Sequence, residues 1–188
     1  MGTKDIIHVV NKFVKQRYDN DEYNWVHNNF VTKYALILGK KLNADLEILE
    51  ISARLHDIDY SRGAKFHTQD SANFAEKFLR KQNYPTKKIE MVKQTMLCHS
   101  QSTIKTIKEP HLEGKILFDA DKMWNTTPIG FARLIAHRYK ENTSYAFILQ
   151  ELEKRLGWFN KLHFNESKEL IKTDLEVCKK FVERFKQV

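Results

Sequence analysis

Apolar residues recur at helical spacing along nearly the whole chain, and no stretch alternates convincingly between apolar and polar residues. The first segment shows the pattern, with Ile6, Ile7, Val10, Phe13 and Val14 on one side of a helix. Such spacing buries one helical face, whereas a half-buried strand would have a period of two. Six glycines and three prolines in 188 residues leave few points at which helices must end. The sequence therefore predicts an all-α protein with short connections.

Short polar or proline-containing segments separate the predicted helices. Asp19-Asn20-Asp21 ends the first helix, and Asp45 is suited to cap the third. The expected helices cover about 4–18, 22–42, 45–56, 67–82, 86–99, 112–123, 128–139, 145–157 and 166–186, with a loop over 100–111. The length suffices for one hydrophobic core, and no repeat or low-complexity tract divides the chain. We therefore expect residues 1–188 to form a single domain.

Composition and charge exclude several classes of protein. Hydrophobic content of 41% is too high for a disordered chain, and no apolar run approaches the roughly 20 residues of a membrane-spanning helix. The N-terminus lacks a signal-peptide pattern, and Cys98 and Cys178 form no Cys-x-x-Cys pair, so we expect a reduced, cytoplasmic protein. Net charge is +8, but the lysines are dispersed through the helices. Such charge is typical of solvated helix faces and also suits an anionic substrate.

Residues 51–72 carry the side chains best suited to chemistry. A helix ends at His56 and Asp57, a glycine-containing loop follows, and His67 opens the next helix. An imidazole beside a carboxylate suits a borderline transition metal. A His-Asp dipeptide is common by chance in a chain with eight histidines, so further ligands are required.

Other helices offer such ligands. His27 edges the apolar face of helix 22–42, and His99 lies on the buried stripe of helix 86–99. Asp119 and Asp121 both fall near the end of helix 112–123 and compete for one ligand position. Taken alone, each residue has a structural explanation as a core histidine or a helix-end carboxylate. Two histidines and two carboxylates around one ion would favour Mn, Fe, Co, Ni or Zn over Mg.

The order of His27, then His56-Asp57, then a distant aspartate resembles the signature of the HD-domain metal-dependent phosphohydrolases. The resemblance covers about residues 22–135. Further segments are similar to a bacterial subgroup that includes nucleotide pyrophosphohydrolases: Lys65-Phe-His67, Ser71-Ala72, His99-Ser100, Glu113 to Lys122, and Ile129 to Arg133. The chain departs from that subgroup at Lys122-Met-Trp124-Asn125 and Thr126 to Gly130, where substrate would enter. The resemblance implies a compact, single-domain HD-type helical bundle, with C-terminal helices over 145–186.

The resemblance also implies the roles of individual residues. The implied metal ligands are His27, His56, Asp57 and Asp121, the last in preference to Asp119. One ion is favoured and two are possible, because equivalents of His67 and His99 hold a second metal in some branches of the family. His67 is otherwise the candidate general acid or a phosphate contact, and Asp59 could orient the attacking water. The candidate substrate-binding residues are Lys122, Arg133, His99, Lys65 and Arg62.

The expected function is metal-dependent hydrolysis of phosphate esters or anhydrides, with a nucleotide as the expected substrate. A cation offsets the charge of phosphoryl oxygens and lowers the pKa of its bound water, which then attacks phosphorus. One alternative is a metal-containing module that senses a nucleotide without turnover. A nucleic-acid-binding protein is a further alternative suggested by the positive charge, although the sequence has no recognition motif. The exact substrate and the oligomeric state stay open.

Overall fold

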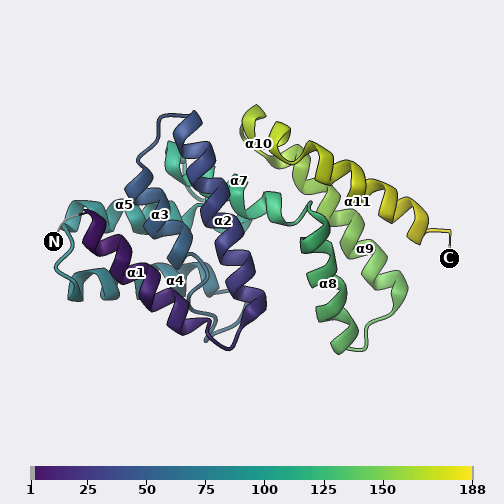
Figure 1. Ribbon diagram of the computed structural model, residues 1–188, viewed down its shortest axis with the longest axis horizontal. Coiled ribbons are helices and arrows are strands. Elements are labelled where there is room, and N and C mark those ends of the chain that lie inside the picture. The colour runs from purple at the N-terminus through teal and green to yellow at the C-terminus, as the bar shows by residue number, and fades with distance from the viewer. Residues whose placement is uncertain (1–2, 188) are drawn as a thin grey trace. The chain divides into compact units, whose positions relative to one another are not determined.

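The computed structural model describes residues 3–187 as α-helices joined by short connections, with no β-strand among them (Figure 1). The all-α prediction is therefore confirmed. The chain divides into two compact units, one up to Ala120 and one from Asp121. The first contains α1 Thr3–Arg17, α2 Glu22–Lys41, α3 Leu46–Leu55, α4 His67–Lys81, α5 Thr86–Leu97 and α6 Gln101–Ile104. The second contains α8 Pro128–Lys140, α9 Tyr145–Leu156, η1 Gly157–Lys161, α10 Asn165–Leu170 and α11 Lys172–Phe185, while α7 Leu112–Trp124 crosses the boundary.

Most helices begin and end within two residues of the positions that the sequence predicts. Asp45 caps α3 as expected, since its side chain accepts the backbone N–H groups of Glu47 at 3.0 Å and Ile48 at 3.1 Å. Two segments differ. The stretch 100–111 contains the short helix α6, which begins where the Ser100 hydroxyl accepts the N–H of Ser102. The predicted C-terminal helix is broken at Ile171, a fully buried residue that separates α10 from α11.

Helix α3 lies at the centre of the first unit. It packs against α1, α2, α4 and α5, and its Ile48, Ile51 and Leu55 are fully buried in one core cluster with side chains of α1, α4 and α5. Burying each of these aliphatic side chains contributes about 1.5–3 kcal/mol. Gly39 of α2 allows α2 and α3 to pack closely, because a Cβ at this position would lie 2.5 Å from Leu49 Cδ1 of α3. The tight packing around α3 fixes the point where its C-terminus emerges.

The second unit has its own smaller core. Buried side chains from α8, α9 and α11 form it: Phe131, Leu134, Ile148, Leu152, Cys178 and Val182. Thr127 caps helix α8, because its hydroxyl accepts the N–H of Gly130 at 3.2 Å, and Pro128 is the first residue of the helix. Whether the two units behave as the single domain expected from the sequence stays a prediction. Among the described helices, none is both long and apolar enough to cross a bilayer.

Candidate metal centre

The C-terminus of α3 presents His56 and Asp57. The last carbonyl groups of a helix have no partner within it, so side chains must satisfy them. The ring of His56 donates from Nδ1 to Ala53 O at 2.7 Å. The amide of Asn28, on α2, donates to Ala53 O at 3.3 Å and to Arg54 O at 2.9 Å. Two side chains therefore cap this helix end and fix the direction in which His56 points.

Three imidazole rings of the first unit are oriented in the same way. Besides His56, the ring of His99 donates from Nδ1 to Met96 O at 2.6 Å, and that of His67 donates to Ala64 O at 2.6 Å. A carbonyl oxygen can only accept, so each Nδ1 must carry the hydrogen. In the neutral imidazole Nε2 then keeps its lone pair. A metal-binding histidine typically has this arrangement, with its other ring nitrogen held by a backbone carbonyl.

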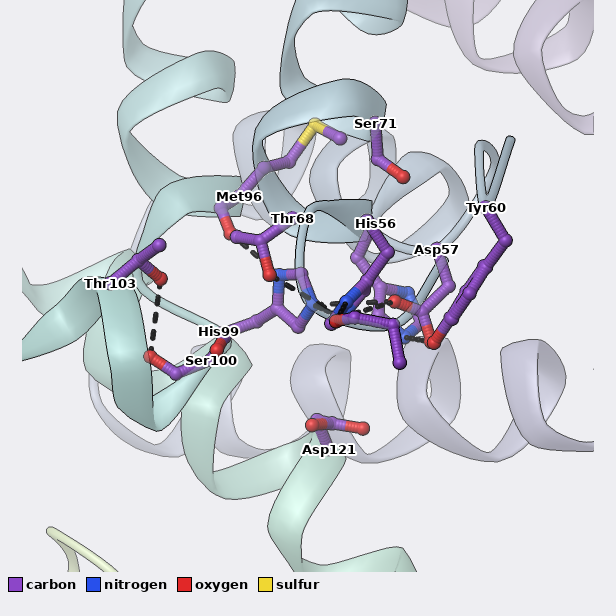
Figure 2. A network of polar contacts seen from close by, with 12 residues as sticks. His56, Asp57, Tyr60, Thr68, Ser71, Met96, His99, Ser100, Thr103 and Asp121 are labelled. Atoms are coloured by element: carbon purple, nitrogen blue, oxygen red, sulfur yellow. Dashed lines mark hydrogen bonds and ion pairs between the residues drawn. The ribbon is translucent and has the colours of Figure 1, made fainter. Parts of the chain in front are cut away.

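The Nε2 atoms of four histidines converge on the Asp57 carboxylate. Oδ2 lies 3.6 Å from Nε2 of His27 and 3.4 Å from Nε2 of His56. Oδ1 lies 3.3 Å from Nε2 of His99 and 3.5 Å from Nε2 of His67. Figure 2 shows the rings of His56 and His99 beside this carboxylate. The side chains thus form two groups of potential ligands that share Asp57, one on each of its oxygens.

The electrostatics of this cluster favour a bound cation. Burial raises the pKa of the Asp57 carboxyl, but the neighbouring histidines outweigh burial, so its pKa lies well below the usual value. The carboxylate is therefore ionised. Its buried Oδ1 accepts no hydrogen bond from the described residues, although Nε2 of His67 and of His99 face it and lie 3.3 Å from each other. Acceptors that face one another in this way are satisfied together by a metal ion or by added protons.

The distances also fit metal coordination. The two groups have ligand atoms 3.2–3.6 Å apart. Ligands about 2.1 Å from one ion are separated by about 3.0 Å at a right angle and by about 3.4 Å at the tetrahedral angle. Either group could close around an ion with small movements. His27 and His56 are the more enclosed pair, at 5% and 0% exposure.

Two contacts at Asp57 come from residues that the sequence analysis did not single out. The hydroxyl of Tyr60 donates to Asp57 Oδ2 at 3.2 Å, and its ring stacks on that of His67 with centroids 4.7 Å apart. The hydroxyl of Tyr18 donates to the backbone oxygen of Asp57 at 3.0 Å. Asn28 was missed as well, although it follows His27 directly. A polar residue next to a proposed ligand is the signal that could have found it.

The loop after Asp57 holds three predicted site residues outside both ligand groups. Asp59 accepts the N–H of Ser61 at 2.9 Å, and this backbone hydrogen bond lowers the pKa of its carboxyl. The guanidinium of Arg62 is paired with Asp70 through Nε and Nη2. Lys65 is exposed, with its ammonium 5.5 Å from the ring centre of Phe66. The catalytic role of Asp59 and the substrate contacts of Arg62 and Lys65 stay predictions.

The remaining predicted residues lie on α7 and in the second unit. Asp119 is fully buried in the first unit, while Asp121 is 8% exposed and lies 2.5 Å from the ammonium of Lys122. Arg155 was not predicted from the sequence. It donates to Gly130 O at 3.0 Å, and burial, followed by the nearby charge of Arg133, lowers its pKa to about 10. The assignment of Asp121 as a metal ligand stays a prediction.

Comparison with known proteins identifies similar sequences and folds. The family model described as HD domain matches residues 26–125. The Lin1889 protein of Listeria innocua is 21% identical over 99% of this chain and 96% of that one, with a TM-score of 0.78. An HD-superfamily hydrolase from Bacillus thuringiensis is 21% identical, with 99% and 97% covered and a TM-score of 0.74. Bacillus subtilis YpgQ, solved in complex with ADP, is 19% identical, with 100% and 96% covered and a TM-score of 0.78. No curated protein matches the chain.

Proposed function

We propose that this protein is a metal-dependent hydrolase of phosphate esters or anhydrides and that its substrate is a nucleotide. The chain belongs to the HD domain family. The observation that carries the proposal is the convergence of four Nε2 atoms on the ionised carboxylate of Asp57. Three of these rings carry their hydrogen on Nδ1, the tautomer in which Nε2 keeps the lone pair that binds a metal. An arrangement of facing acceptors is costly unless a cation is shared between them.

The residues assigned to one divalent ion are His27, His56 and Asp57, with Asp121 as the fourth ligand expected from the sequence. A cation held there offsets the charge of phosphoryl oxygens and lowers the pKa of a coordinated water. Tyr60 donates to Asp57 Oδ2 and so restricts how this carboxylate can rotate. Asn28 and Ala53 O fix the ring of His56, which limits the motion of that ligand.

His67 and His99 face the other oxygen of Asp57, and two roles fit this position. In the first, His67 donates a proton to the leaving oxygen of the substrate, because it is the less enclosed of the two, with its side chain 17% exposed against 2% for His99. In the second, both rings and Asp57 Oδ1 hold another ion, which the facing Nε2 atoms favour. The number of ions bound per chain distinguishes these roles.

Three observations support a nucleotide as substrate. The related fold of YpgQ was solved with ADP. Lys122 lies next to the proposed ligand Asp121. In the same unit, the positive charge of Arg133 is close enough to Arg155 to lower the pKa of its guanidinium. Several cations suit several phosphate groups, since each anionic group needs a charge-assisted partner. We therefore propose that nucleoside di- or triphosphates are better substrates than monophosphates.

A hydrolysis screen over nucleotides and sugar phosphates tests the proposal, with Mn, Co, Ni or Zn added to matched samples. The expected result is turnover of a nucleotide that chelation abolishes and that His56→Ala lacks. Nucleotide binding without turnover in every metal would instead assign a sensing role. Tight, salt-sensitive binding of random duplex DNA without hydrolysis would favour the nucleic-acid alternative.

A further inference from the structure

A pocket lies on the first unit, between α1, α2 and the end of α3, and no proposed catalytic residue lines it. Its volume is about 330 Å³, and it is lined by His8, Asn11, Lys12, Lys15, Trp25 and Arg54. We propose that this pocket is a binding site for the phosphate group of a small molecule, separate from the metal centre. The proposal does not depend on the hydrolase activity, because it rests on other side chains.

The pocket concentrates positive charge, of which Glu50 offsets only a part. Positions 8, 11, 12 and 15 lie on one face of α1, which places Lys12 and Lys15 side by side on the same wall. Neither lysine forms an ion pair with a described residue, and neither does Arg54. Some other basic side chains of this unit do have a carboxylate partner, as Lys88 has in Glu47 and Lys93 in Glu76. Adjacent like charges without a counterion repel each other, so an anion between them is stabilising.

Arg54 is held in a fixed orientation with one edge of its guanidinium unused. Its Nη1 donates to Asn28 Oδ1 at 3.1 Å and to Asn29 Oδ1 at 2.6 Å, and its Cζ lies 5.6 Å from the ring centre of Trp25. Within the described residues, no hydrogen bond uses Nε or Nη2, and Nε is buried. Arg54 lines the pocket, so Nη2 is available to donate a charge-assisted hydrogen bond to a phosphate oxygen, and the guanidinium is oriented before the ligand arrives.

A buried acceptor in the pocket narrows the chemistry of the ligand further. The amide of Asn11 donates from Nδ2 to Glu50 Oε1 at 3.2 Å, which fixes its orientation because a carboxylate can only accept. Its Oδ1 is buried and receives no hydrogen bond from the described residues. A ligand that carries both anionic oxygens and an O–H group, such as hydrogen phosphate or a sugar phosphate, suits Arg54 and Asn11 together. Glu50 offsets part of the charge, so the net cationic character suits a small dianion.

Tryptophan fluorescence of the full-length protein, titrated with inorganic phosphate, tests the proposal, because Trp25 lines the pocket. We expect a saturable change that is absent in Trp25→Phe. The double variant Lys12→Glu/Lys15→Glu should weaken phosphate binding by about tenfold or more, since it removes two charge-assisted contacts. Both lysines are exposed, so the fold should be retained. The matched control is Lys77→Glu/Lys81→Glu, which changes the net charge equally at two exposed positions of α4 and should bind as the wild type does.

Ribose 5-phosphate, titrated in parallel, separates the two sources of the phosphate group. Tighter binding than that of inorganic phosphate would assign the pocket to a sugar phosphate or nucleotide, and equal binding would assign it to the phosphate group alone. Either result supports the proposal. The absence of a saturable signal that depends on Trp25 would overturn it. Equal weakening in the control variant would also overturn it, because the effect would then follow net charge and not the pocket.

Discussion

Asn28→Ala is expected to destabilise the protein and the metal centre together. The amide of Asn28 is 1% exposed and takes part in three hydrogen bonds, with Ala53 O, Arg54 O and the guanidinium of Arg54. The two neutral bonds contribute about 1 kcal/mol each, and the charged one contributes about 1.5–3 kcal/mol. Alanine recovers about 0.5 kcal/mol through its higher helix propensity. The net loss in the free energy of unfolding is therefore about 3–4.5 kcal/mol.

Urea denaturation of metal-free protein measures this loss without the stabilisation that a bound ion would add. Asn73→Ala serves as the control, because its amide makes only a surface contact with Gln69 on the same helix, and it should change stability by no more than about 0.5 kcal/mol. Metal affinity should also fall in Asn28→Ala, since the ring of His56 shares the carbonyl of Ala53. A loss below about 1 kcal/mol with unchanged metal affinity would refute the assignment of Asn28 as the residue that holds the end of α3.

Three further predictions concern other side chains. Asp121→Ala should abolish metal binding, whereas Asp119→Ala should keep the metal and mainly lower stability. If elemental analysis gives the reverse result, the metal ligand is Asp119 and not Asp121. Lys122→Ala should lower kcat/KM by an amount equivalent to about 1.5–3 kcal/mol without metal loss, and unchanged kinetics would exclude Lys122 from phosphate binding. Burial raises the pKa of the Cys98 thiol to about 11 and that of the Cys178 thiol to about 12. Neither thiol should therefore react with iodoacetamide at pH 8 until the protein is unfolded. Mass spectrometry that finds either cysteine labelled in the folded protein would contradict this prediction.

Helix positions could be predicted well because they depend on local patterns. The apolar spacing of α1 and the cap at Asp45 are visible within a few residues of sequence, and the structure has both. The break at Ile171 was missed because a buried isoleucine fits the apolar pattern of a continuous helix. A periodic pattern records which face of a segment is apolar and not where a continuous apolar face is interrupted.

The candidate site was predictable where the order of residues carries information. His27, His56 and Asp57 were grouped by their order, and the structure brings them within contact distance. The orientation of each ring could not be predicted, because it depends on carbonyl groups such as Ala53 O that become available only at helix ends. Tyr60 was missed for a similar reason: its contact with Asp57 depends on the path of the loop, which no periodic pattern specifies.

The metal content of the purified protein tests the central claim most directly. Elemental analysis should find about one equivalent of a transition metal per chain in the wild type. His56→Ala and Asp57→Ala should both lose it, because each removes a ligand from the His27, His56 and Asp57 group. Two equivalents in the wild type would assign the second ion to His67 and His99. Equal metal in the wild type and in both variants would contradict the claim that these side chains form a metal centre.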